Sequence, residues 1–293
     1  MVALAMLQGA DDTTGMMLVA LAVFTVICFF ALGLKFFVNL FEVVTAPGAS
    51  LKHHGSNDTA FYSIAVVFLG HLIGSIVLVL NRSQMSAGYH AFAEEFGTAL
   101  AAANPNHNYQ DVAANWATST LDALYQTQVD TNLLWLGLWG MAIWVLAGLV
   151  YFLAAKMFGS PVSLSDLMST TAYPMFFYTI GWCCYTAATF SGFQAFSEGF
   201  KPASMMGQSV LYIVGMVIML YAIVLYAIAF MQATDLGFGQ LIVGFLLYSL
   251  ITGGIYFGIM NKVAGPAISK FTSDVASVDF SKPGYTLPGS EGL

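Results

Sequence analysis

Long, uninterrupted apolar runs dominate this sequence and limit its fold more than any other feature. A helix of about 20 apolar residues crosses the hydrocarbon core of a bilayer. A membrane β-barrel would instead show alternating segments of about ten residues. Charged residues make up only 8% of the 293 residues, against about 25% in soluble domains. The sequence therefore predicts an all-α fold, a polytopic transmembrane helix bundle.

About six spans are expected. Their approximate limits are Met16–Leu40, Ala60–Leu80, Leu133–Ala155, Ser165–Phe190, Gly207–Met231 and Phe238–Met260. The N-terminus lacks the basic region of a secretory signal, so the first run is interpreted as a retained span. Lys35 lies near the end of that span, where a lysine side chain reaches the membrane interface. Asn57, Asp58 and Thr59 precede the second span and are the candidate helix caps.

A polar segment, residues 81–131, separates the second and third spans. Two parts of it, 87–103 and 109–128, have helical patterns with aromatic side chains on one face. The aromatic residues of interest are Tyr89, Phe92, Phe96 and Trp116. We expect these side chains to contact a partner or the membrane surface.

The fourth span begins with recognisable turn and cap residues. Gly159 and Pro161 interrupt the apolar pattern and predict a turn. Ser163 is a suitable N-cap, and Asp166 follows three residues later, as in an acidic capping box. A carboxylate in the first turn also suits the helix dipole. We therefore expect a short hairpin to lead into this span.

Pro174 falls about two turns into the fourth span. A proline there removes one main-chain donor and is expected to kink the helix. Thr170 and Thr171 lie one turn upstream, where their hydroxyls are expected to satisfy the carbonyl that the proline leaves unbonded.

His71 is the one ionisable residue deep within an expected span. Such a group is a functional candidate, and the alternative is a neutral histidine that bonds to a neighbouring helix. His53 and His54 are adjacent in a connector and are interpreted as surface histidines near headgroups, because no further ligand follows at metal-site spacing. Six glycines indicate close helix approach: Gly137, Gly140, Gly148, Gly253, Gly254 and Gly258.

Three stretches, in order along the chain, carry a resemblance. They are LFEVVTAPGASL at 40–51, FGSPVSLSDLMSTTAYP at 158–174, and QATDLGFGQLIVG at 232–244. Together they resemble the Yip-one domain family, membrane proteins named for interacting with Ypt/Rab GTPases, in its prokaryotic form. The second stretch resembles the glycine turn, capped helix start and Tyr-Pro of the family's third span, which brings in Tyr173. The resemblance implies a core of five spans.

The chain departs from that family pattern by adding a first span and the segment 81–131. Its expected domains are therefore an N-terminal tail and span at 1–40, a Yip-like membrane domain at 41–260, and a polar tail at 261–293. The long cytoplasmic N-terminal region of the eukaryotic members is missing, so GTPase binding is not transferred.

Two arguments about orientation disagree. The resemblance places the connector before Ala60 in the cytoplasm, with both termini and segment 81–131 on the other side of a prokaryotic cell membrane. Under that orientation only three of the eight basic residues face the cytoplasm: Lys35, Lys52 and Lys156. The positive-inside rule favours the reverse.

No motif of an enzyme active site is present, and no catalytic residue, metal ligand or cofactor is assigned. The net charge of −7 argues against nucleic-acid binding. The sequence therefore predicts a non-enzymatic scaffold, membrane organiser or accessory subunit, with lipids and other membrane proteins or further copies of itself as partners. The alternative is a small-solute channel or permease that uses His71 and the Pro174 kink. The residues singled out for function or structure are His71, Ser163, Asp166, Tyr173 and Pro174.

Overall fold

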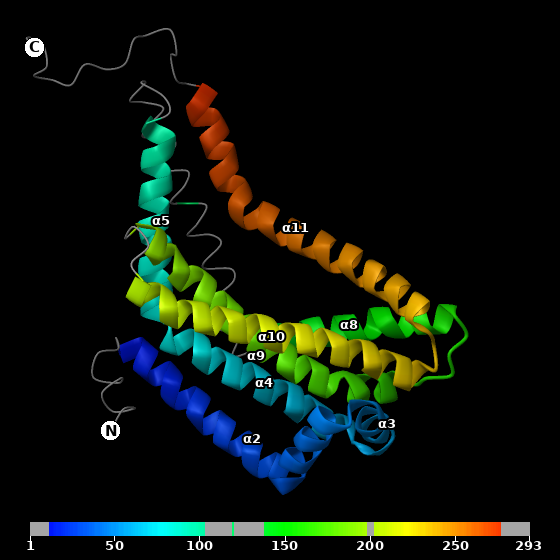
Figure 1. Ribbon diagram of the computed structural model, residues 1–293. Helices are drawn as coiled ribbons and strands as arrows, with labels where there is room; N and C mark the ends of the chain where they lie inside the picture. Colours follow the sequence, from blue (N-terminus) through cyan, green and yellow to red (C-terminus); the bar gives the residue numbers. More distant parts are fainter. Residues whose placement is uncertain (1–11, 103–118, 120–137, 198–201, 277–293) are drawn as a thin grey trace, which may run out of the picture. The chain divides into compact units, whose positions relative to one another are not determined.

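The computed structural model describes residues 12–102, 119, 138–197 and 202–276 (Figure 1). These residues form helices joined by short turns, which confirms the all-α class. The chain divides into two parts. The first comprises Met1–Arg82, Asn132–Ala188 and Ser209–Gly253, and the second comprises Ser83–Thr131, Thr189–Gln208 and Gly254–Leu293. The candidate site lies wholly within the first part.

The first helix, α2 (Asp12–Thr45), is broken inside its apolar run. Gly33 has φ 61° and ψ −164°, a conformation that is essentially restricted to glycine. The chain turns there, and a second helical stretch leads to α3 (Figure 1). The expected span from Met16 to Leu40 lies within Gly15–Thr45, which is long and apolar enough to cross a membrane, but the helix is broken at Gly33. The straight portion ends near Gly33, which places Lys35 just beyond the break.

The connector before the second span is helical rather than irregular. Helix α3 (Pro47–Asn57) starts with a proline, which suits the first turn because its missing N–H would be unbonded there in any case. Helix α4 (Ala60–Leu80) follows at the limits expected for the second span. The Thr59 hydroxyl accepts a hydrogen bond from the Tyr62 main-chain N–H at 3.3 Å, so Thr59 is the cap among the three candidates.

Helix α8 (Leu138–Met157) ends in the predicted turn, where Gly159 has φ 79°. Helix α9 (Leu164–Ser197) then runs without interruption through Pro174. Helix α10 (Pro202–Thr234) and helix α11 (Phe238–Ala276) follow, separated by a tight turn. Helix α11 is longer than expected and continues through Pro266 into the predicted tail. Helix α5 (Arg82–Ala102) belongs to the polar segment.

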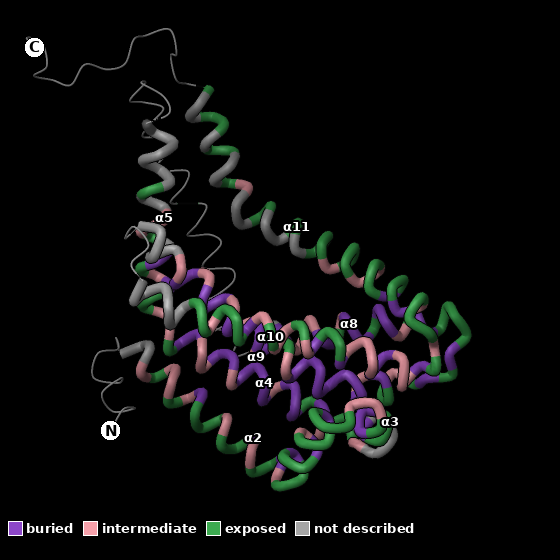
Figure 2. The backbone as a smooth tube through the Cα atoms, in the orientation of Figure 1, coloured by how far each residue is buried: buried purple, intermediate pink, exposed green. Residues whose placement is uncertain are grey.

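Helices α4 and α9 carry most of the buried residues in the first part (Figure 2). Glycines allow them to touch. A Cβ on Gly70 would lie 2.9 Å from Phe176 Cα, and one on Gly74 would lie 2.6 Å from Cys183 Sγ. On another side of α9, a Cβ on Gly181 would lie 2.9 Å from the Gly215 carbonyl oxygen of α10. Helix α9 is therefore enclosed by its neighbours.

The six glycines expected at close contacts divide into three groups. Cβ atoms on Gly140 and Gly148 would overlap His71 and Met168, so the prediction is confirmed there. Cβ atoms on Gly253, Gly254 and Gly258 would meet no described atom within 4 Å, so the structure shows no close contact at those three. Gly137 lies outside the described residues.

An apolar cluster joins four helices through one tyrosine. Tyr151 of α8 contacts the rings of Tyr226, Phe230 and Tyr248 at centroid distances of 5.3, 5.5 and 5.9 Å. Leu167 of α9 completes the cluster. This packing ties α8, α9, α10 and the start of α11 together.

By length and apolar composition, five of the described helices are able to cross a membrane. The chain is thus a multi-pass integral membrane protein. Helix α9 is not among the five, because serine and threonine lower its hydropathy. Its buried position explains that composition, since its surface faces other helices rather than lipid. The sixth span stays a prediction.

Candidate functional site

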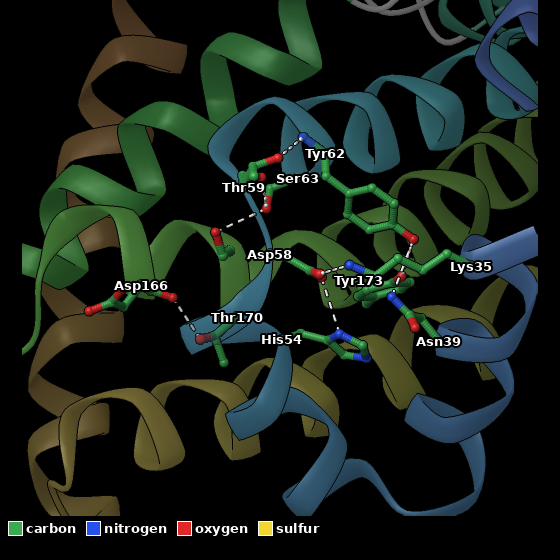
Figure 3. A network of polar contacts seen from close by, with 11 residues as sticks. Lys35, Asn39, His54, Asp58, Thr59, Tyr62, Ser63, Asp166, Thr170 and Tyr173 are labelled. Carbon is green, nitrogen blue, oxygen red and sulfur yellow. Dashed lines mark hydrogen bonds and ion pairs between the residues drawn. The ribbon is translucent and has the colours of Figure 1, made fainter. Parts of the chain in front are cut away.

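A polar cluster lies where the end of α2, helix α3 and the start of α4 meet α9 (Figure 3). We call Lys35, Asn39, His54, Asp58, Tyr62 and Tyr173 the junction cluster. The break at Gly33 brings Lys35 to this position from α2. Asp58 lies between α3 and α4, and its main-chain N–H caps α3 by donating to the His54 carbonyl at 3.0 Å. The end of α2, helix α3 and the turn before α4 thus place their polar side chains close together.

Asp58 is the centre of the junction cluster. Its Oδ1 accepts a hydrogen bond from Lys35 Nζ at 2.7 Å. Its Oδ2 lies 3.1 Å from His54 Nδ1. The Asp58 and His54 side chains are 2% and 1% exposed, whereas Lys35 is 55% exposed. One nearly buried carboxylate therefore faces two positive or potentially positive groups.

The electrostatics of Asp58 reflect two opposed effects. Burial raises the pKa of its carboxyl, because the charged form loses water. The approach of His54 and the hydrogen bond from Lys35, with the favourable charge of Lys35, outweigh burial. The pKa of Asp58 therefore lies below its ordinary value, and the carboxylate is ionised at neutral pH.

Two tyrosines extend the junction cluster into the bundle. The Tyr62 hydroxyl accepts a hydrogen bond from Asn39 Nδ2 at 3.3 Å and lies 3.1 Å from the Tyr173 hydroxyl. Lys35 Nζ lies 4.7 Å from the centre of the Tyr62 ring, a cation–π distance. These contacts join α2, α4 and α9 through side chains that have no charge of their own apart from Lys35.

Beside the tyrosines, Ser63 Oγ donates a hydrogen bond to Ser169 Oγ at 3.0 Å. Both side chains are buried. This bond gives α4 and α9 a further polar link close to the junction cluster (Figure 3).

Comparison with protein-family models, with curated proteins and with solved structures finds no match to this chain. The resemblance to the Yip-one domain family therefore stays a prediction. Among the described residues, no group of three or more His, Cys, Asp or Glu side chains is arranged to hold a metal ion.

The interpretation of His54 as a surface residue is wrong. His54 is buried, and its ring lies 5.2 Å from the Tyr173 ring. Position 54 falls on the inner face of α3 and position 53 on the outer face, so His53 is exposed while its neighbour is not. Adjacent helical residues point about 100° apart, and the sequence did not show which of the two faced the bundle.

His71 is buried at mid-length in α4, as expected. Its ring occupies the space beside Gly140 of α8, where a Cβ would overlap the His71 ring. Its Nε2 has no hydrogen-bond partner among the described residues. Ser75, one turn further along α4, is also buried with an unbonded hydroxyl in that same described set.

The capped start of α9 agrees with prediction. The Asp166 main-chain N–H donates to Ser163 Oγ at 3.0 Å, and the Asp166 side chain is exposed. Tyr173 joins the junction cluster, and Pro174 is buried beside it within a continuous helix.

The two threonines before Pro174 do not bond as expected. Thr170 Oγ1 donates to the Asp166 carbonyl at 2.6 Å, and Thr171 Oγ1 donates to the Leu167 carbonyl at 2.9 Å. The carbonyl left unbonded by the proline belongs to Thr170 itself. A side chain bonds more readily to the turn before it than to its own residue, which explains the difference.

The proposed aromatic contacts of the polar segment are only partly described. Tyr89, Phe92 and Phe96 lie in α5, so the first predicted helix of the segment is confirmed. Trp116 and all but one residue of the second predicted helix lie outside the described residues.

Sequence reasoning missed the junction cluster, although two signals were present. Lys35 is the first basic residue of the chain and ends one span, while Asp58 precedes the next. Antiparallel neighbouring spans bring such ends together. His54 and Asp58 are also four residues apart, a spacing at which helical side chains meet.

Proposed function

We propose that this protein is a non-enzymatic scaffold, membrane organiser or accessory subunit of a larger membrane complex. The proposal rests on the hydrogen bonds that buried polar side chains make in the first of the two parts of the chain. They bond across helices: Ser63 with Ser169, Trp144 with Thr171, Tyr62 with Tyr173, and Ser160 with the Thr234 carbonyl. Side chains used in this way hold helices together and are not available to line a solute path.

The glycine contacts support the same function. Helix α9 touches α4 and α10 at main-chain distance, so the bundle is tightly packed at its centre. Exposed apolar residues cover the outer faces of α2 and α10, as suits contact with lipid or with other membrane proteins. A packed body with apolar flanks fits a protein that acts by association.

The aromatic side chains of α5 are the proposed partner contacts. A photo-crosslinking amino acid is placed at Tyr89, Phe92 or Phe96, one position at a time, in native membranes. Phe30 serves as the control, because it is 84% exposed on the apolar face of α2. We expect discrete protein adducts from α5 positions and mainly lipid adducts from position 30. Absence of protein adducts at all three α5 positions would contradict the proposal.

The Yip-like resemblance adds an orientation to this proposal. It places the protein in a prokaryotic cell membrane with Lys52 inside and segment 81–131 outside. Cysteines introduced separately at Lys52 and Ser119 test it, because the three native cysteines are buried and free. Labelling in intact cells is expected at position 119 and not at 52. The reverse result would assign the opposite orientation.

A small-solute channel or permease is the second candidate, and His71 is the observation that favours it. A buried histidine with an unbonded Nε2 at mid-helix is unusual in a membrane span. The test measures flux of protons, K⁺ and glycerol in proteoliposomes. His71→Ala is expected to abolish flux, and His90→Ala, at an exposed position in α5, is expected to leave it unchanged. A wild-type protein that moves none of the three probes would exclude this alternative for those solutes.

A further inference from the structure

His71 and Ser75 lie one turn apart on α4, and they are only 4% and 1% exposed. Residues four apart on a helix share a face, so the two side chains are neighbours. Neither His71 Nε2 nor Ser75 Oγ has a hydrogen-bond partner in the described part of the chain. Two unbonded polar atoms thus lie together within a helix that is able to cross a membrane.

Several buried hydroxyls of this protein bond to their own helix, and Ser75 does not. Three threonines donate to the main-chain carbonyl four residues earlier, at 2.9, 2.9 and 2.7 Å: Thr171, Thr179 and Thr234. Ser75 has the same local acceptor, the carbonyl of His71, but its Oγ makes no such bond. A buried polar group without a partner is costly. The Ser75 hydroxyl is therefore open to bond with a further molecule.

The His71 ring has one nitrogen engaged and one open. A ring N–H donates to the Gly140 carbonyl of α8, and Nε2 is the atom without a partner. The proton of the neutral ring is therefore on Nδ1, and Nε2 presents a lone pair. Gly140 also restricts the ring, because a Cβ there would overlap it. Nε2 is thus a hydrogen-bond acceptor in a fixed position.

The surroundings exclude a charged ligand. Apart from His71, helix α4 carries no acidic or basic residue. The charged residues of α2, α8 and α9 lie at helix ends or beyond the break in α2: Asp12, Lys35, Glu42, Lys156 and Asp166. An ion inside a bilayer needs a counter-charge or a full set of polar ligands, and two polar atoms do not supply them. A ligand of this pair is therefore neutral.

The two side chains also set the size and the chemistry of the ligand. Side chains four residues apart on a helix have Cβ atoms about 5–6 Å apart. Hydrogen bonds that involve hydroxyl groups are about 2.8 Å long, so one or two heavy atoms bridge the pair. The ligand must donate a hydrogen bond, because Nε2 only accepts, and Ser75 Oγ is able to donate in return.

We propose that His71 and Ser75 bind one small neutral hydrogen-bond donor, a molecule of the size of water or ammonia, between α4 and α8. The ligand donates to His71 Nε2 and accepts from Ser75 Oγ. This binding site goes beyond the scaffold function, and it does not require that the protein moves solutes.

The test is solid-state NMR of the full chain in lipid bilayers, with ¹⁵N-labelled histidine. The His71 signals are those that disappear in His71→Phe. A hydrogen bond to the unprotonated nitrogen of an imidazole moves its ¹⁵N resonance upfield, and magnetisation passed from water protons to the ring shows contact with water. We expect the wild-type Nε2 resonance to have the hydrogen-bonded shift and to receive magnetisation from water.

Two serine variants locate the ligand. Ser75→Ala removes one of its two partners and is expected to lose most of the transfer from water and to move the Nε2 resonance downfield. Ser63→Ala is the matched control, because Ser63 is also buried in α4 but bonds to Ser169 of α9. It is expected to give the wild-type His71 signals.

Ammonium chloride added at alkaline pH distinguishes the two donors. Loss of transfer from water with the hydrogen-bonded shift retained identifies ammonia as the preferred ligand, and unchanged transfer identifies water. A wild-type Nε2 resonance at the position of an unbonded nitrogen would overturn the site, whether or not a variant folds. A hydrogen-bonded shift without transfer from either molecule, or wild-type signals in Ser75→Ala, would also overturn it. The readout is binding at His71, so an absence of flux in proteoliposomes does not bear on it.

Discussion

The closest approach of a glycine Cβ position to the main chain of another described helix gives the sharpest prediction about stability. A Cβ on Gly215 of α10 would lie 2.7 Å from the Tyr185 main-chain nitrogen and 2.9 Å from the Gly181 carbonyl oxygen of α9. Ordinary contacts of a Cβ begin at 3.4 Å. Main-chain atoms cannot rotate away, so Gly215→Ala must push two helices apart by several tenths of an ångström. Such overpacking costs about 1–3 kcal/mol.

The matched control is Gly253→Ala in α11. A Cβ on Gly253 would meet nothing within 4 Å. Both substitutions gain the same helix propensity, about 1 kcal/mol for glycine to alanine. The difference between the two variants therefore isolates the overpacking cost. Melting temperatures shift by about 2–4 °C per kcal/mol in proteins of 150–250 residues, so Gly215→Ala is expected to melt several degrees below Gly253→Ala.

Thermal unfolding is followed with a thiol-reactive fluorogenic dye in detergent. The dye reports unfolding because Cys28, Cys183 and Cys184 are all buried and free. Gly215→Ala is expected to react at a lower temperature than wild type, and Gly253→Ala at the same or a higher one. Equal melting temperatures for the two variants would refute the close contact of α9 and α10 at this position.

Three further predictions concern the junction and the helix caps. Gly33→Ala is expected to destabilise the fold by about 1–3 kcal/mol through backbone strain. Gly48→Ala is the control, because its Cβ would make an ordinary 3.8 Å contact. It is expected to be close to neutral in the same thermal assay. Because the pKa of Asp58 is lowered on folding, its stabilising effect is complete above the unfolded pKa and is lost as pH falls through the folded pKa. Asp58→Asn is therefore expected to melt at a lower temperature than wild type at pH 7, and the gap between the two melting temperatures is expected to shrink below about pH 4. A gap that stays constant from pH 7 to below pH 4 would contradict this stabilising effect of the Asp58 carboxylate. Ser163→Ala removes the cap of α9 and is expected to cost about 1 kcal/mol, whereas Ser163→Thr should melt close to wild type.

Much of the fold follows from local patterns that the sequence displays. The limits of α4, the turn at Gly159 and the caps at Thr59 and Ser163 depend on neighbouring residues alone. The break at Gly33 does not, because a lone glycine in an apolar run has the same local pattern whether it is helical or not. Gly33 differs from Gly74 only in what the rest of the bundle requires there.

The candidate site depends on contacts between residues that are far apart in the sequence. Lys35 and Asp58 are 23 residues apart, and their meeting depends on the hairpin geometry and on the break in α2. The burial of His54 depends on how α3 rotates against α9. The glycine contacts were also not predictable from neighbouring residues. Gly181 and Gly215 are in contact across two helices, but nothing near either residue distinguishes it from the open Gly253.

The composition of α9 has a consequence for how the protein is made. The helix carries serine, threonine and a proline along its length, and its threonine hydroxyls bond to its own carbonyls. Alone in lipid it would partition less favourably than the five helices around it in the sequence. It leaves the ribosome after α4 and α8 and before α10, the helices that enclose it. We therefore expect α9 to enter the bilayer against helices already inserted, and to be fully retained there only when α10 has been synthesised.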